Sequence, residues 1–243
     1  MRGNLLNAMT PPLSIIVPTL NEAAGIVAHL EALQPLRERG AEAIVVDGGS
    51  ADGTAALAAP WADAVASAPR GRASQMNAGA KLARGDVLLF LHADTRLPDQ
   101  ADLLIAEALA DSRRSWGRFE VTIASTHPLL SVVAWSMNWR SRLTGIATGD
   151  QAMFVRRPAF ETAGGFPELP LMEDIALSRS LKRTGRPLCL QERALTSGRR
   201  WEQRGVLHTI ILMWRLRAGY WFGAEPRRLA EDYASARTLK RLP

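Results

Sequence analysis

Residues 13–22 read LSIIVPTLNE, an apolar run that ends abruptly in polar residues. Four of its first five side chains are large and aliphatic, which is typical of a strand buried on both faces. Pro18 stops the run, because proline has no N–H for a sheet ladder. Residues 43–46, 64–67 and 87–91 have a similar character and predict three further short strands.

Helical segments alternate with these strands. Ile26, Leu30 and Leu33 fall on or near one face of a helix predicted over residues 23–39, and a second helix is predicted over residues 73–83. Strands that are apolar on both faces and alternate with helices predict an α/β fold with a parallel, doubly wound sheet.

Polar clusters follow three of the predicted strands, at residues 19–22, 47–54 and 92–94. Ligands of such sheets bind beyond the carboxyl ends of the strands, so these clusters indicate a site at that edge. A purely structural interpretation stays open for each cluster. Thr19 or Asn21 could cap the next helix, and a turn rich in Gly and Asp is common in ordinary loops.

The second half of the chain is less regular. It predicts two more strands and two amphipathic helices, followed by a tail that is mostly helical; these segments are 118–123, 151–156, 127–143, 173–184 and 205–242. We therefore expect one domain over residues 1–204, with halves at about 13–98 and 99–204, and a helical C-terminal extension over residues 205–243.

The composition favours a folded protein with anionic partners. Of 243 residues, 47% are hydrophobic and 22% charged, and the formal net charge is +6, which suits nucleotides, phosphates or an acidic lipid surface. No basic stripe or nucleic-acid-binding motif is present, so we expect no nucleic-acid partner. The single cysteine excludes an intrachain disulfide, no signal peptide is evident, and no apolar run reaches the roughly 20 residues of a spanning helix, so we expect a cytoplasmic protein.

Taken together, the motifs resemble the family 2 glycosyltransferases of the GT-A fold. The residues that carry this resemblance are 14–22, 45–54, 77–80, 85–86, 89–94, 164–166 and 173–174. The resemblance runs from about Leu13 to Trp201 and implies a Rossmann-like, mostly parallel twisted sheet flanked by helices. It also implies a soluble, metal-dependent enzyme that moves a sugar from a nucleotide-diphosphate donor, with a UDP-sugar favoured, to an acceptor hydroxyl. LHADTRLP at 91–98 and GDQ at 149–151 are most similar to a small subgroup linked to arsenosugar biosynthesis.

The resemblance assigns donor binding mainly to residues 13–98, with acceptor binding in residues 99–204. Asp47 would accept a hydrogen bond from the base, beside a nucleoside wall that includes Glu22. Arg72 would pair with the diphosphate through its directed donors, although a solvated residue at a helix start is the alternative. The full set of implied donor-binding residues is Pro18, Thr19, Glu22, Asp47, Gly49, Ser50, Asp52, Arg72, His92, Ala93, Asp150, Arg200 and Trp201.

Asp94 occupies the place of the family's metal-binding Asp-x-Asp element. A divalent cation, Mn²⁺ or Mg²⁺, would stabilise the charge that develops on the diphosphate leaving group, and such cations prefer carboxylate oxygen. His92 replaces the first Asp of the element. Three roles stay open for His92: contact with the donor, a shift of metal preference towards Mn²⁺, and a structural role at a strand end. His208 could also reach the metal, although a position on a helix face is favoured.

Glu173 and Asp174 open a predicted helix, where the helix dipole favours acidic residues in any case. The resemblance implies that Asp174 is the general base that deprotonates the acceptor hydroxyl, with inversion at the anomeric carbon. Glu173 would orient its neighbour or the acceptor. Residues 197–201 partly resemble the Gln-x-x-Arg-Trp motif of processive members, but Ser197 stands in place of Gln, so processive synthesis is not expected.

Two other functions are weighed against glycosyl transfer. A nucleotidyltransferase usually carries a Gly-rich and basic loop after the first strand, whereas residues 18–22 contain neither type of residue. A non-catalytic nucleotide-sugar-binding protein predicts loss of the metal or base carboxylate, and both Asp94 and Asp174 are present.

Tryptophans and arginines gather in the two predicted helices near residues 135–142 and 214–222. Three interpretations stay open: peripheral contact with a lipid surface, a homodimer interface, and ordinary core packing. The first of these would place the protein at the inner face of the cytoplasmic membrane. The acceptor, whether small molecule, lipid or glycan, is not identified by the sequence.

Overall fold

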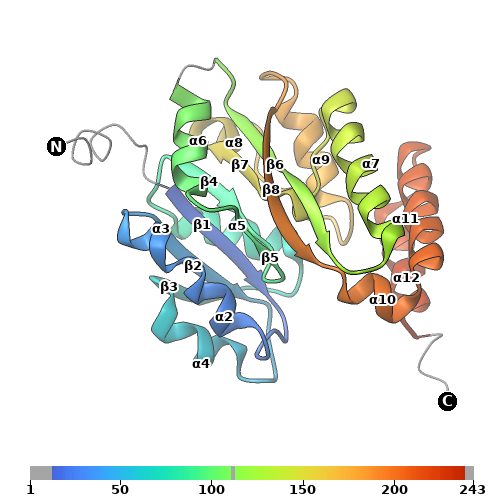
Figure 1. Ribbon diagram of the computed structural model, residues 1–243, viewed down its shortest axis with the longest axis horizontal. Coiled ribbons are helices and arrows are strands. Elements are labelled where there is room, and N and C mark those ends of the chain that lie inside the picture. The colour runs from blue at the N-terminus through green and yellow to red at the C-terminus, as the bar shows by residue number, and fades with distance from the viewer. Residues whose placement is uncertain (1–12, 111–112, 239–243) are drawn as a thin grey trace.

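The fold is built on one eight-stranded sheet with helices on both faces (Figure 1). This computed structural model describes residues 13–110 and 113–238. The strand order is β3-β2-β1-β4-β7-β6-β8-β5. Within the described residues, no helix is both long and apolar enough to span a bilayer.

The N-terminal half of the sheet is parallel, as the alternation of strands and helices predicts. Its four strands are β1 (Leu13–Thr19), β2 (Glu42–Asp47), β3 (Ala64–Ser67) and β4 (Val87–Phe90). Thr19 pairs in register with Asp47, so the polar residues that follow β1 and β2 leave the sheet at the same edge.

The other half of the sheet is mixed, so the parallel alternation of residues 13–91 does not continue into it, while the expected α/β fold with flanking helices is confirmed. β7 (Met153–Arg156) runs antiparallel to both β4 and β6 (Trp116–Ala124), and β5 (Thr95–Arg96) runs antiparallel to β8 (Leu188–Ser197). β6 and β8 are parallel to each other. β7 is apolar and buried like the strands of the parallel half, and burial on both faces carries no information about strand direction.

Alternate residues of β1 enter two separate cores, one on each face of the sheet. Ile15 and Val17 pack on one side and Ile16 on the other. The first core is covered by α2 (Ile26–Glu31), α3 (Gln34–Glu38) and α6 (Ala101–Ala110), and the second by α5 (Arg72–Leu82), α8 (Arg157–Thr162) and α9 (Glu173–Leu181). Short α4 (Thr54–Ala58) follows β2, and η2 (Gly149–Gln151) precedes β7.

The helix predicted over residues 23–39 is two short helices, α2 and α3. Pro35 lies in the first turn of α3 and cannot donate the backbone hydrogen bond that would continue α2. Leu33 and Leu36 are still buried in the same core. The apolar pattern therefore predicts which residues are buried, but not the break between the two helices.

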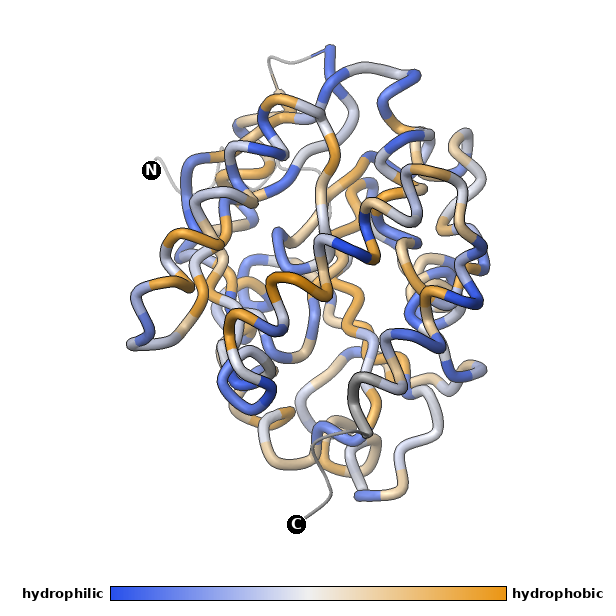
Figure 2. The backbone as a smooth tube through the Cα atoms, turned by 90° about the vertical axis from the view of Figure 1, so that its right-hand side faces the viewer, coloured by the Kyte–Doolittle hydropathy of each residue, from blue (hydrophilic) through white to orange (hydrophobic). Residues whose placement is uncertain are grey.

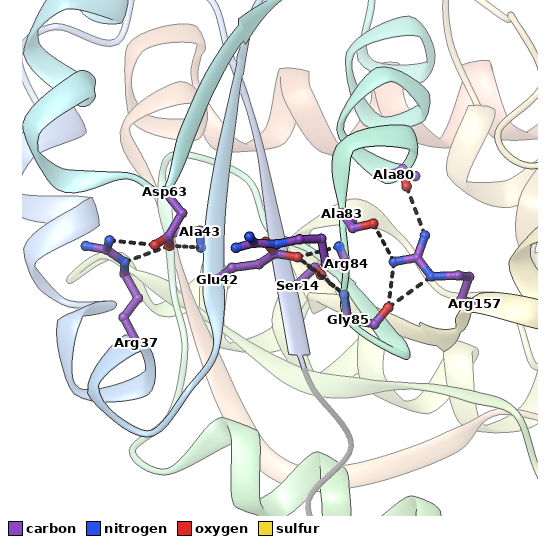
Figure 3. A network of polar contacts seen from close by, with 10 residues as sticks. All are labelled: Ser14, Arg37, Glu42, Ala43, Asp63, Ala80, Ala83, Arg84, Gly85 and Arg157. Carbon is purple, nitrogen blue, oxygen red and sulfur yellow. Dashed lines mark hydrogen bonds and ion pairs between the residues drawn. The ribbon is translucent and has the colours of Figure 1, made fainter.

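Helix α5 packs closely on β1, and its C-terminal end is held by hydrogen bonds. A Cβ at Gly79 would lie 2.5 Å from the Ile16 side chain, so only glycine allows the helix this close to β1. At the edge opposite the polar loops, Arg157 donates to the backbone oxygens of Ala80, Ala83 and Gly85, as Figure 3 shows. The start of α5 is thereby held at the edge where the polar clusters lie.

The C-terminal tail is helical, as predicted, and packs against the sheet domain. It comprises α10 (Arg199–Arg204), α11 (Val206–Trp221) and α12 (Pro226–Thr238), beside α7 (Pro128–Thr144) at the right of Figure 1. Leu212, Leu216 and Leu229 form a cluster with Ile146, Met172 and Ile175. The tail therefore meets the segments immediately before η2 and around the start of α9.

Candidate active site

A cleft of about 420 Å³ opens at the carboxyl ends of β1 and β4. Segments far apart in the sequence meet there: the loop after β1, the starts of α5 and α9, η2, and the inner faces of α11 and α12. The predicted site residues that line it are Pro18, Thr19, Glu22, Arg72, His92, Ala93, Asp94, Asp150, Glu173 and Asp174. The donor-side and acceptor-side predictions therefore share one cavity.

Asp47 lies beside this cleft rather than in its lining. Its carboxylate accepts hydrogen bonds from the N–H groups of Gly49 (2.9 Å) and Ser50 (2.8 Å), and from the hydroxyls of Ser50 and Thr19. Burial opposes ionisation of Asp47, but these hydrogen bonds hold its pKa below the ordinary value. Asp47 is thus an ionised anchor of the turn that carries Gly49 and Ser50.

The loop after β1 is tied to the loop after β2. The N–H of Asn21 donates to the Ser50 hydroxyl (2.8 Å), and that of Ala23 donates to Asp52 (3.0 Å). Gln75, which sequence reasoning missed, donates from its amide to the backbone oxygens of Thr19 (2.7 Å) and Val46 (2.8 Å). Asp52 therefore supports the wall of the cleft, and Gln75 holds the ends of both strands from α5.

Asp94 follows β4 and presents its carboxylate to the cleft. Among the described residues, that carboxylate takes part in no hydrogen bond or ion pair. Nor do those residues contain a group of three or more His, Cys, Asp or Glu placed to hold a metal ion. The protein donor set offered here is therefore a single free carboxylate.

The imidazole of His92 contacts the carboxylate of Asp150. Its Nδ1 lies 3.3 Å from Asp150 Oδ1. A Cβ at Gly149 would lie 2.3 Å from the imidazole, so the ring rests directly against the glycine backbone. His92 is therefore a packed residue of the cleft wall that holds η2 against the end of β4.

Asp174 is fixed by two backbone hydrogen bonds at the start of α9. Its Oδ2 accepts from the N–H of Gly149 (2.9 Å) and its Oδ1 from that of Ile175 (2.7 Å). Met172 at the N-cap has φ 68°, the left-handed region that most side chains avoid. The backbone is bent so that both acidic residues of α9 reach the cleft.

Glu173 is buried and lies in a different electrostatic environment. Burial, and next the charge of Asp174, raise the pKa of Glu173, while Arg72 and His92 oppose that shift. Removal from water works against the charge of Arg72, but Glu173, Asp150, Tyr233 and Asp174 keep its pKa above the ordinary value. Arg72 is thus the cation that faces the acidic wall of the cleft.

Sequence reasoning missed the contribution of the C-terminal helices to this site. Met213 and Arg217 of α11 and Tyr233 of α12 line the cleft. Trp201 instead lines a neighbouring groove, and His208 is exposed and lines neither cavity. Arg200 lies in α10, and its side chain is outside the described part of the structure.

Comparisons with known proteins agree with this geometry. Residues 14–161 match the family described as Glycosyl transferase family 2. No curated protein sequence matches the chain. Solved structures of similar fold are numerous, and three of them are described next.

Staphylococcus aureus TarS 1–349 in complex with UDP-GlcNAc has a TM-score of 0.64 and 20% identity, over 76% of this chain and 58% of that one. A mannosyltransferase from Pyrobaculum calidifontis in complex with GDP-Man and Mn²⁺ has a TM-score of 0.62 and 21% identity, over 95% and 71%. Glucosyl-3-phosphoglycerate synthase from Mycobacterium tuberculosis, with Mg²⁺ and UDP, has a TM-score of 0.57 and 19% identity, over 79% and 73%. The chain thus spans less than two thirds of the TarS fragment, and these likenesses establish the fold.

Proposed function

This chain belongs to glycosyl transferase family 2, and we propose that it moves a sugar from a nucleotide-diphosphate donor, with a UDP-sugar favoured, to an acceptor hydroxyl. One observation carries the proposal: the free carboxylate of Asp94 and the oriented carboxylate of Asp174 open into the same cleft, which the loop after β1 also lines. A sugar bound between them would have its leaving group near Asp94 and its acceptor near Asp174.

The donor would lie along the loop after β1. Pro18, Thr19 and Glu22 would contact the nucleoside, and Arg72 would pair with the diphosphate, since a guanidinium offers several directed donors to phosphate. The nucleotide sugars in the complexes of TarS and the Pyrobaculum enzyme support this class of donor. The resemblance of residues 91–98 and 149–151 further supports the arsenosugar-associated subgroup.

The single carboxylate of Asp94 fits a divalent cation that shares its coordination with a substrate. Mg²⁺ in such sites is held by one or two carboxylates together with substrate phosphates and water. Asp94 would hold Mn²⁺ or Mg²⁺ in this way, and the ion would neutralise charge on the departing diphosphate. Mn²⁺ and Mg²⁺ in two structures of similar fold support the assignment.

The residues of this chain would carry the remaining chemistry. An acceptor oxygen forms a bond to the anomeric carbon while the bond from that carbon to the diphosphate oxygen breaks, and the bonding electrons leave with the diphosphate. Asp174 takes the proton of the acceptor hydroxyl, and attack from the opposite side inverts the configuration. Buried Glu173 would hold the acceptor or Asp174 in position.

Over the whole chain, we assign catalysis to residues 1–204, with the donor half at about 13–98 and the acceptor half at about 99–204. Residues 205–238 would complete the cleft, because Met213, Arg217 and Tyr233 line it. The alternatives of nucleotidyl transfer and of binding without catalysis predict nucleotide binding as well, so a test of the proposal must follow the sugar.

The test separates donor binding from sugar transfer. We expect Asp174→Asn to keep the thermal stabilisation by UDP with Mn²⁺ and to lower kcat by about 10²–10⁴-fold, the usual contribution of a positioned base. Glu168→Gln, an exposed residue outside the cleft, is the matched control. A screen of UDP- and GDP-sugars, read by release of nucleotide diphosphate and transfer of labelled sugar, identifies the donor. Unchanged turnover in Asp174→Asn would refute the base assignment.

A further inference from the structure

A second cavity of about 240 Å³ lies between α7 and α11, and we call it the α7–α11 groove. It is continuous with the active-site cleft, because Asp150, Met213, Arg217 and Tyr233 line both. A molecule in the groove would therefore extend one end into the cleft that contains Asp174. Pro18, Thr19, Glu22 and Arg72, which are proposed to bind the donor, line the cleft and not the groove, so we assign the groove to the acceptor side.

The lining of the groove away from the cleft is almost entirely apolar. Its residues there are Leu129, Val132, Val133, Ser136, Met137, Trp201, Thr209, Ile210 and Trp214. The two hydroxyls already donate within their own helices, Ser136 to the oxygen of Val133 (2.8 Å) and Thr209 to that of Gly205 (3.0 Å). Such a wall suits a hydrocarbon chain and offers little to the hydroxyls of a sugar or glycan.

Arg217, at the junction between groove and cleft, has an unsatisfied donor, and so does Arg140, which lines neither cavity. Nε of Arg217, and Nε and Nη2 of Arg140, are buried and have no hydrogen-bond partner among the described residues. The two side chains are close: burial, and next the charge of Arg217, lower the pKa of Arg140 to about 10. An oxyanion in the groove would accept from Arg217 and relieve the repulsion between the two guanidinium groups.

The outer mouth of the groove opens on an exposed apolar surface. Val132 and Trp214 line the groove and are 58% and 72% exposed. The same two helices also expose Trp135, Trp139, Leu143, Leu207, Ile211 and Trp221, and exposed Phe222 follows α11 directly. Figure 2 faces this side of the molecule. Apolar side chains gathered on a surface mark an interaction site, and aromatic side chains among them favour a lipid interface.

From these observations we propose that the α7–α11 groove binds the hydrocarbon chain of an anionic membrane lipid, which is the acceptor, with its oxyanion at Arg217 and its hydroxyl at Asp174. The surface around the mouth would rest on the membrane, and the lipid chain would enter the groove from there. The proposal that the lipid is the acceptor rests on the proposed function, which gives Asp174 its role as base. The proposal that the groove binds a lipid does not depend on that role.

The test uses decyl phosphate as a probe that has both chain and charge, and follows the fluorescence of the intact chain, since Trp201 and Trp214 line the groove. We expect saturable binding at least tenfold tighter than that of decyl maltoside, which lacks the charge, and no response to inorganic phosphate. Arg217→Gln should bring the affinity for decyl phosphate down to that for decyl maltoside.

Two serines on α7 supply a matched pair of variants. Ser136 lines the groove and Ser131 does not, and both are exposed, so neither substitution should affect folding. Ser136→Phe should fill the groove and weaken decyl phosphate at least tenfold, whereas Ser131→Phe should bind it as the unaltered chain does. Wild-type affinity in Ser136→Phe, or a stable dimer that covers the surface and binds no amphiphile, would overturn the proposal.

Thermal stabilisation by UDP with Mn²⁺ separates this proposal from the proposed function. Ser136→Phe should retain that stabilisation fully, because the groove is outside the donor site. If the unaltered chain bound no UDP but gave the expected decyl phosphate results, the glycosyltransferase chemistry alone would be refuted and the lipid site would stand. Co-sedimentation with vesicles of phosphatidylcholine containing 30% phosphatidylglycerol should occur for the intact chain; no binding at low salt would contradict entry from a membrane.

Discussion

Several residues around the cleft hold backbone conformations that only their surroundings can enforce. Among the described residues, four that are not glycine have a positive φ, and three of them, Asn21, Ala152 and Met172, belong to segments at the site. Each such conformation costs about 1–3 kcal/mol, which packing elsewhere must offset. The cleft is therefore preorganised by strain in the loop after β1, after η2 and at the start of α9.

A substitution at Gly149 tests how closely η2 must approach the end of β4. Gly149→Ala would place a Cβ 2.3 Å from the His92 ring, so the imidazole must move and its contact with Asp150 is lost. We expect a loss of about 1–3 kcal/mol in the free energy of unfolding and reduced turnover. Gly25→Ala, where a Cβ meets nothing within 4 Å, is the control. Equal stability and activity of the two variants would show that His92 is not held in this way.

His29 gives a pH dependence of known sign. Burial lowers its pKa from 6.5 to about 4, with Asp94 opposing the shift and Arg96 adding to it, so the unfolded chain takes up a proton at higher pH than the folded one does. Stability contributed by neutral His29 is therefore present above pH 6.5 and is lost as pH falls towards 4, by up to about 3 kcal/mol. His29→Leu should remove this loss in denaturant unfolding between pH 7 and 4. Parallel stability profiles of the two proteins would contradict the assignment.

At the scale of elements, the end of α5 depends on a residue from a different helix. Arg157 of α8 donates to three backbone oxygens at the C-terminal end of α5 and in the turn after it. Arg157→Met would leave these acceptors without their donor, and we expect a loss of about 2–3 kcal/mol by chemical denaturation. Arg84→Met in the same network (Figure 3) is the control, because the Arg84 side chain is 79% exposed and its ion pair should contribute under about 1 kcal/mol. A loss in Arg157→Met no larger than that in Arg84→Met would contradict this role.

The sequence predicts the elements whose pattern is local. β1, β2 and β4 are found because they are apolar on both faces, and the polar clusters after them coincide with the cleft. β8, the longest strand, is missed because exposed Gln191, Glu192 and Arg193 interrupt it where its pairing with β6 is irregular. Its strand character depends on β6 and β5, which no local pattern reveals.

The same limit applies to the site. Asp94 and Asp174 follow from motifs at the ends of elements, whereas Arg217 and Tyr233 reach the cleft only because α11 and α12 pack on Met172 and Ile175. Gln75 is also missed, since a single amide inside a helix gives no signal of the two strand ends that it joins. Residues positioned by tertiary packing alone are thus beyond a reading of the sequence.

At the scale of the whole molecule, the cleft is complete only when the parts lie together. The donor wall comes from the parallel half of the sheet, the acidic wall from η2 and α9, and the third wall from the C-terminal helices. The same helices form the α7–α11 groove and its exposed apolar mouth. In this arrangement the proposed donor site and the proposed lipid site adjoin the one cleft that contains Asp94 and Asp174.

The claim on which this account depends is that Asp94 holds a divalent cation against the donor, and metal-dependent nucleotide binding tests that claim most directly. We expect UDP at a hundredfold excess over its Kd to raise the Tm by at least about 5 °C when Mn²⁺ is present, and to have little effect without it. Asp94→Asn should abolish the effect of Mn²⁺, whereas Asp99→Asn, an exposed neighbour outside the cleft, should keep it. Stabilisation by UDP that is independent of Mn²⁺, or that survives in Asp94→Asn, would contradict the account.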